Sequence, residues 1–158
     1  MKNRISNLTR FIIVLAISIA AVSCEKDETK MPEILDFELG YDNSKTVHAG
    51  NDLHIDADIR AENRIDLIVI EIHFEGDHKK SISVASGENH HGWEVDTTYY
   101  KFNGLKNSLF HEHLKVPLEA EPGEYHFYFK VIDMEGYTAE IKEDLEIREP
   151  EVSEDNQL

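Results

Sequence analysis

The sequence is poor in cysteine and in positive charge, and each shortage excludes a class of protein. Its 158 residues include one cysteine, so no disulfide can form within one chain. Lys and Arg together number 16 against 32 Asp and Glu, which gives a net charge of −16. Because neutralising phosphates requires a basic face, this composition excludes nucleic acid as a partner. The acidity favours solubility of an exposed domain, and attraction of cations or basic partners is the alternative explanation.

The chain also lacks the motifs that mark common enzyme sites. It has no G-x-S-x-G nucleophile elbow and no glycine loop that would cradle a phosphate. The run His111-Glu112-His113 is not the H-E-x-x-H motif of zinc peptidases. On a strand, Glu112 would point to the face opposite both histidines and could not act as their general base. We therefore expect a protein that is not an enzyme.

Long apolar runs are also missing, apart from residues 11–24, FIIVLAISIAAVSC, which follow basic residues at the N-terminus. A basic start, an apolar stretch and a small-residue exit are typical of a signal peptide. The run is too short for a spanning helix, which needs about 20 apolar residues. Residues 21–24 resemble a lipobox, in which the cysteine is acylated. We predict a lipoprotein signal peptide over 1–23 and lipidation of Cys24, which would anchor the protein in a membrane. An ordinary cleaved signal followed by an unmodified cysteine is the alternative.

Polar segments flank the body of the chain on both sides. Residues 24–31 are predicted to be a lipidated tether, and residues 149–158 an acidic flexible tail. The order Cys24-Glu25-Lys26-Asp27-Glu28 resembles the export signal of Bacteroidota lipoproteins. That resemblance implies an outer-membrane location with the domain facing the cell exterior. A merely solvated linker is the alternative interpretation.

The body, residues 32–148, alternates between apolar and polar residues with period two and predicts an all-β domain. Turn residues separate runs that read as strands over 33–39, 53–59, 64–74, 109–118, 125–133 and 137–147. Strict alternation would place Leu35, Phe37 and Leu39 on one face, and Leu118 on the apolar face of its strand. About seven strands with this turn spacing favour an immunoglobulin-like β-sandwich.

Four short sequence segments resemble those of a known family. They are Ile70-Glu71-Ile72-His73, Gly92-Trp93, His111-Glu112-His113 and Gly123-Glu124-Tyr125-His126. Together with the N-terminal segment they resemble an uncharacterised lipoprotein family of Bacteroidota, domain-of-unknown-function family 4625. The resemblance covers most of residues 31–148. It implies a lipid-anchored β-sandwich with no assigned reaction.

The sequence contains nine histidines, and strand geometry would place several of them on the same face of a sheet. His111 and His113 are two residues apart, so they would share one face at a spacing of ~6.6 Å along the strand. If the strands follow immunoglobulin order, the strand at 53–59 lies alongside and presents His54, Asp56 and Asp58 outward. This set would suit zinc or copper as a cofactor. The alternative to a metal site is that these histidines merely occupy exposed strand positions. A His-x-His pair is expected by chance at this composition.

Two further groups of residues are candidates for binding. On the other sheet, outward His73 and Glu71 would lie near His126 and form a second metal cluster. The stretch between residues 76 and 108 carries His90, His91, Trp93 and Tyr99, whose rings would stack on a glycan or dock a protein partner. The alternative is that Trp93 and Tyr99 cap the core as part of an extra strand, as their alternation with polar residues indicates.

The sequence therefore predicts a surface lipoprotein that acts as a binding or interaction module, with an outer-membrane protein as one kind of partner. A divalent-metal binding lipoprotein and a glycan-binding accessory lipoprotein are the alternatives.

Overall fold

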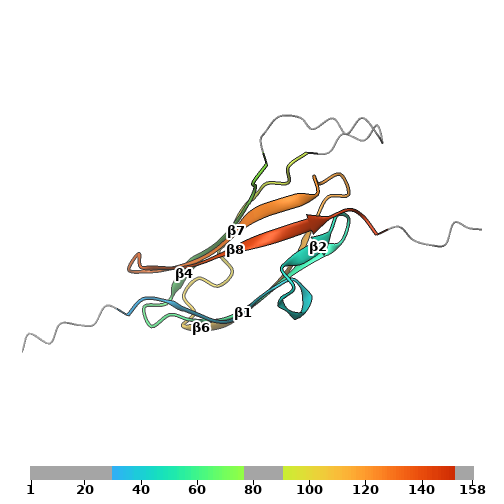
Figure 1. Cartoon of the computed structure of the whole chain (residues 1–158). Coiled ribbons are helices and arrows are strands. Elements are labelled where there is room, and N and C mark those ends of the chain that lie inside the picture. Colours follow the sequence, from blue (N-terminus) through green and yellow to red (C-terminus); the bar gives the residue numbers. More distant parts are fainter. Residues whose placement is uncertain (1–29, 77–90, 152–158) are drawn as a thin grey trace, which may run out of the picture.

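A computed structural model describes residues 30–76 and 91–151 as two packed β-sheets (Figure 1). Its strands are β1 (Glu33–Leu39), β2 (Thr46–His48), β3 (Asp52–Arg60), β4 (Ile65–Phe74), β5 (Val95–Tyr99), β6 (Asn107–Lys115), β7 (Gly123–Asp133) and β8 (Thr138–Arg148). The predicted signal peptide over 1–23, the lipidation site Cys24 and the candidate ligand His90 lie outside the described residues. So does most of the predicted tether and tail.

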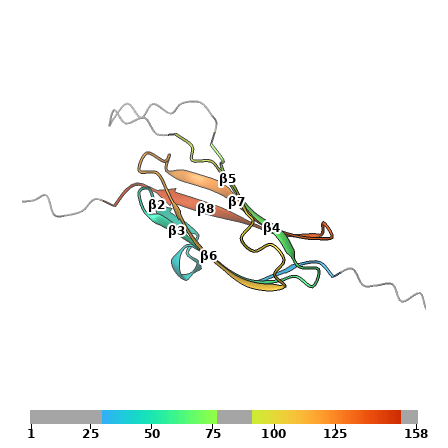
Figure 2. The same cartoon turned by 180° about the vertical axis from the view of Figure 1, so that it is seen from behind.

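The strand order is that of an immunoglobulin-like sandwich. One sheet has the order β1-β3-β6 and the other β2-β8-β7-β4-β5. The pair β2 and β8 is parallel, whereas β3 with β6 and β7 with β8 are antiparallel. The described chain enters at one end of the sandwich and leaves at the other (Figure 2). The arrangement confirms the predicted fold class.

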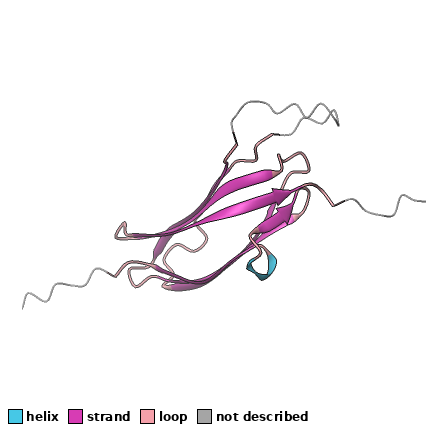
Figure 3. Ribbon diagram, in the orientation of Figure 1, coloured by secondary structure: helices cyan, strands magenta, loops and turns pink. Residues whose placement is uncertain are grey.

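Among the described residues, helical structure is confined to one short turn. The 3-10 helix η1 (Tyr41–Asn43) follows β1 and stands out from the sheets (Figure 3). Within residues 30–76 and 91–151, no helix is long and apolar enough to cross a membrane.

Alternation along β3 and β7 builds the core between the two sheets. Their inward side chains are fully buried: Leu53, Ile55, Ala57 and Ile59 of β3, and Tyr125, Phe127, Phe129 and Val131 of β7. Phe110 of β6 joins the two layers, because its ring centroid lies 5.0 Å from that of Phe129 in an edge-on arrangement. Burying one such large apolar side chain stabilises a fold by about 1.5–3 kcal/mol. The core therefore fixes which face of β3 and β6 is left outside.

The strict alternation predicted for β1 is wrong, because the strand contains a β-bulge. Its register against β3 shifts between Leu35, which pairs with Asp58, and Glu38, which pairs with Asp56. Asp36 lies in this interval with a φ of 47°. A bulge inserts one extra residue and so reverses which face the following side chains occupy. Leu35 consequently lies opposite an outward residue of β3 and not on the face of Phe37 and Leu39.

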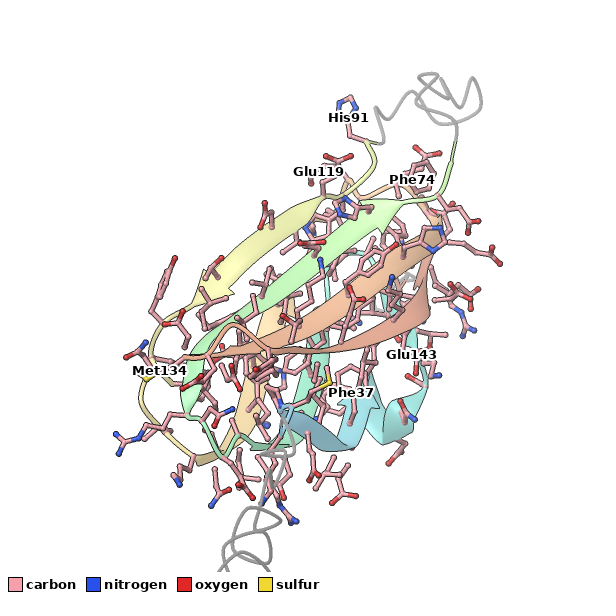
Figure 4. The ribbon with its side chains drawn as sticks, turned by 90° about the vertical axis from the view of Figure 1, so that its left-hand side faces the viewer. Phe37, Phe74, His91, Glu119, Met134 and Glu143 are labelled. Atoms are coloured by element: carbon pink, nitrogen blue, oxygen red, sulfur yellow. The ribbon has the colours of Figure 1, made fainter. Side chains whose placement is uncertain are left out.

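Beyond the bulge, β1 contributes to the core. Leu39 is fully buried, and the ring of Phe37 lies with its centroid 5.9 Å and 5.6 Å from those of Phe127 and Phe129 (Figure 4). The extra residue lets Ile34 and Leu39 both pack against the core. The same extra residue turns Glu38 to the outer face.

The predicted apolar face of the strand over 109–118 is only partly correct. Phe110 and Val116 are buried and Leu114 packs against the core, but Leu118 is 62% exposed. The strand ends at Lys115, and Pro117 interrupts the run. Proline has no N–H for the sheet ladder, so the alternation does not continue to Leu118.

A buried tyrosine ties β7 to the turn before it. The hydroxyl of Tyr125 donates to the Glu121 carbonyl at 2.6 Å and accepts from the Trp93 amide at 3.3 Å. Burial raises the pKa of the Tyr125 phenol, so the group stays a neutral donor. This contact is the tyrosine corner of immunoglobulin-like folds.

We predict that Tyr125→Phe lowers the free energy of unfolding by about 1–2 kcal/mol, because it removes these hydrogen bonds from a buried site. Urea unfolding followed by tryptophan fluorescence measures the change. The matched control is Tyr137→Phe, since Tyr137 is exposed. Equal unfolding midpoints for the two variants would show that the corner contributes nothing to stability.

Candidate metal site

Three histidines from two strands meet on the outer face of the three-stranded sheet. His54 of β3 pairs directly with His113 of β6, and His111 lies one pleat further along, opposite Asp56. The centroids of the three rings are 5.1–5.2 Å from one another. Each ring offers a nitrogen, and these nitrogens lie within 4.8 Å of one another. Among the described residues, no other group of three or more such side chains is as close.

The cluster is buried at its centre and open at its rim. His54 is only 9% exposed although it lies on the outer face, because the ring of Tyr41 stacks on it at 5.0 Å and 5°. His111 and His113 are exposed. The site is therefore accessible from solvent at one side and closed by an aromatic ring at another.

Asp56 orients one of the two exposed histidines. Its carboxylate Oδ2 lies 3.0 Å from Nδ1 of His111. A hydrogen bond from Nδ1–H to a carboxylate fixes the tautomer and leaves the Nε2 lone pair free. Carboxylate partners of this kind are typical of metal-binding histidines.

His54 carries an unpaired polar atom. Its Nδ1 is buried and has no hydrogen-bond partner among the described residues. Its Nε2 lies 3.8 Å from Oε1 of Glu38. An unpaired buried group of this kind costs about 1–3 kcal/mol and calls for a physical explanation, of which an ion is one.

The donor set suits a borderline divalent cation. Three neutral imidazoles are the protein ligands of many zinc sites, and imidazole also suits copper. A tetrahedral zinc ion at ~2.0–2.1 Å from each nitrogen would set the nitrogens ~3.3 Å apart. The observed upper separation of 4.8 Å is larger, and rotation of the exposed His111 and His113 rings would close the difference.

The second predicted cluster does not form a comparable group. His73 of β4 does lie opposite His126 of β7, as the sequence indicated. However, the described carboxylate near His73 is that of Glu71, at 3.9 Å. His126 instead contacts Asp144 at 3.4 Å and Glu75 at 3.7 Å. The two histidines therefore have separate carboxylate partners, and each contact is that of an exposed surface pair.

The aromatic candidates of the 76–108 stretch are half-buried. Trp93 and Tyr99 pack against the core, and Tyr99 pairs with Ile68 of β4 at the edge of the five-stranded sheet. Tyr99 ends β5, the extra strand considered as the alternative, and Trp93 lies just before that strand. His91 is exposed, and its side chain extends away from the strands (Figure 4). Binding of a glycan by these residues stays a prediction.

Two residues of the site could not be found from sequence reasoning. Alternation with Leu39 already places Glu38 on the polar face of its strand, but the sequence does not show that this strand pairs with β3 beside His54. Tyr41 reaches His54 from η1. The signal available for Tyr41 was its turn-rich context, Gly40-Tyr41-Asp42-Asn43, in which Gly40 has a φ of 74°. That context indicates a turn but not which way its aromatic side chain points.

Comparison with solved structures finds similar folds in larger proteins. OgpA from Akkermansia muciniphila is similar to 76% of this chain with a TM-score of 0.51 and 9% identity, and the match spans 29% of OgpA. Spo0M, the sporulation control protein from Bacillus subtilis, is similar to 75% of this chain with a TM-score of 0.45 and 12% identity, and the match spans 50% of Spo0M. The first of these likenesses shows the fold alone, and the second is too weak to add to it.

No match is found among curated proteins. A family model, by contrast, matches residues 21–148, which include all three histidines of the cluster. Its description is Domain of unknown function (DUF4625), and the chain belongs to this family.

Proposed function

We propose that this protein is a non-enzymatic, lipid-anchored lipoprotein of the outer membrane whose immunoglobulin-like domain binds a divalent transition metal, zinc or copper. The observation that carries the proposal is the convergence of His54, His111 and His113 from two strands. A chance His-x-His pair on an exposed strand would not require a third histidine directly opposite it.

Two features of the cluster favour a metal over a simple surface group. Asp56 holds the His111 ring with one nitrogen free, which is the arrangement of a metal ligand with a supporting carboxylate. The buried His54 Nδ1 has no hydrogen-bond partner among the described residues, and a bound cation would supply one. The net charge of −16 adds a field that attracts cations to the domain.

The location rests on the N-terminal sequence. Residues 11–24 give the pattern of a lipoprotein signal, and the polar residues after Cys24 give that of an export signal. Several acyl chains on Cys24 would hold the domain stably at the membrane. A metal site on such a domain would sample the solution immediately outside that membrane.

We predict that the protein binds one zinc or copper ion with a micromolar or lower dissociation constant, and that His111→Ala with His113→Ala abolishes this binding. Titration calorimetry on the metal-free protein measures both. The matched control is His73→Ala with His126→Ala, which removes two histidines from the other sheet. Absence of micromolar binding in the wild type, or equal losses in the two double variants, would overturn the proposal.

A second prediction concerns the supporting carboxylate. Asp56→Asn should weaken zinc binding about 10–100-fold, because His111 would lose the partner that orients its ring. Asp58→Asn is the control, since Asp58 lies on the same face of β3 but contacts Arg60 at 3.3 Å. If both variants bind zinc with the wild-type affinity, Asp56 has no part in the site.

The anchor is tested by Cys24→Ser. The variant should leave the membrane fraction and fail to incorporate labelled fatty acid, because the acylated thiol is gone. Thr29→Ser, a change of similar size within the predicted tether, should remain in the membrane fraction and carry the label. A membrane-bound, labelled Cys24→Ser protein would refute the lipoprotein assignment.

A further inference from the structure

Glu38 reaches the histidine cluster through the bulge in β1. Before the bulge, Ile34 pairs with the core residue Ile59, and after it Glu38 pairs with the outward residue Asp56. Bulges commonly redirect a side chain beside a functional site. Here the redirected side chain lies on the side of β3 opposite to β6, because β3 is the middle strand of its sheet.

The charge around Glu38 is unbalanced in the absence of a cation. Glu38 and Asp56 are carboxylates in directly opposed positions of neighbouring strands. Like charges in such positions destabilise a sheet. Among the described residues, the basic side chains in contact with these two carboxylates are histidines alone, His54 beside Glu38 and His111 beside Asp56. The other carboxylates that β3 presents on this face have basic partners, Asp58 with Arg60 and Asp52 with Lys115.

The ring of His54 lies between Glu38 on one side and the β6 histidines on the other. Its Nε2 is the nitrogen near Glu38, at 3.8 Å. The two nitrogens of an imidazole point in widely different directions, so Nδ1 does not face Glu38 when Nε2 does. That nitrogen is the buried, unpaired one. The carboxylate of Glu38 is not part of the group whose ligand atoms lie within 4.8 Å of one another.

We propose that Glu38 is a positioning residue. Its carboxylate, 3.8 Å from Nε2 of His54, moves into hydrogen-bond distance of Nε2–H when the ion binds, so that His54 binds the metal through Nδ1. This inference rests on the proposed function, the binding of a metal by the three histidines. It assigns to His54 and Glu38 the same relation that His111 and Asp56 have, with the roles of the two ring nitrogens exchanged. Both carboxylates then act through a histidine, and neither contacts the ion.

This assignment accounts for two features together. The metal supplies the partner that Nδ1 of His54 lacks. The positive charge of the ion, transmitted through the two imidazoles, offsets the repulsion between Glu38 and Asp56. The bulge in β1 thereby serves the site as well as the core.

The direct test is the coordinating nitrogen of each histidine. The full-length protein, labelled with ¹⁵N-histidine and loaded with ¹¹³Cd²⁺ in detergent, should show scalar coupling from cadmium to Nδ1 of His54 and to Nε2 of His111. Coupling to Nε2 of His54 would overturn the inference, while the proposed metal site would stand. Absence of cadmium coupling to any of the three histidines would instead remove the proposed function.

A variant gives an independent readout. Glu38→Gln should weaken zinc binding about 10–100-fold and shift the neutral His54 ring toward the other tautomer in the metal-free protein. The matched control is Glu33→Gln, which changes an exposed glutamate of the same strand that lies opposite Arg60. Wild-type zinc affinity and an unchanged tautomer in Glu38→Gln would refute the role of Glu38. If that variant fails to fold, the cadmium experiment on the wild type still decides the question.

Discussion

The antiparallel register between β3 and β6 is the constraint on which both the core and the candidate site depend. It places Ala57 opposite Phe110 on the inner face and His54 opposite His113 on the outer face. A slip of one residue would exchange the two faces of a strand and carry its apolar side chains into solvent. Burial of Ile55 and Phe110 therefore holds the histidines in place. The core thus fixes the strand positions of the three histidines, and Tyr41 and Glu38 add contacts to His54.

Sequence reasoning succeeds where the period of a strand alone decides the outcome. The common face of His111 and His113 follows from their spacing, and the approach of His54 follows once the strands take immunoglobulin order. Sequence reasoning fails where a single backbone irregularity determines which face a side chain occupies. The bulge at Asp36 turns Leu35 outward and Ile34 toward the core, against the predicted alternation. The turn that begins at Gly40 brings Tyr41 over His54. Neither event changes the apolar pattern, so the pattern does not reveal them.

The candidate site and the stability of the domain are coupled through His54. Its ring is 9% exposed and one nitrogen is unpaired within the described structure, which is a cost carried by the folded state alone. A cation that binds the folded chain and not the unfolded chain stabilises the fold by mass action. Binding of the proposed ion would thus offset the cost at His54. In the proposed site, core packing and the stacked Tyr41 would hold His54 before the metal arrives, and the exposed His111 and His113 rings would rotate to meet it.

The coordination shell of the bound metal is the most direct test of this account. X-ray absorption spectroscopy at the zinc edge, on protein loaded with one equivalent of zinc, counts the imidazole ligands and measures their distances. The account predicts three imidazoles with Zn–N distances of ~2.0–2.1 Å. A shell of oxygen atoms with one imidazole or none would contradict it.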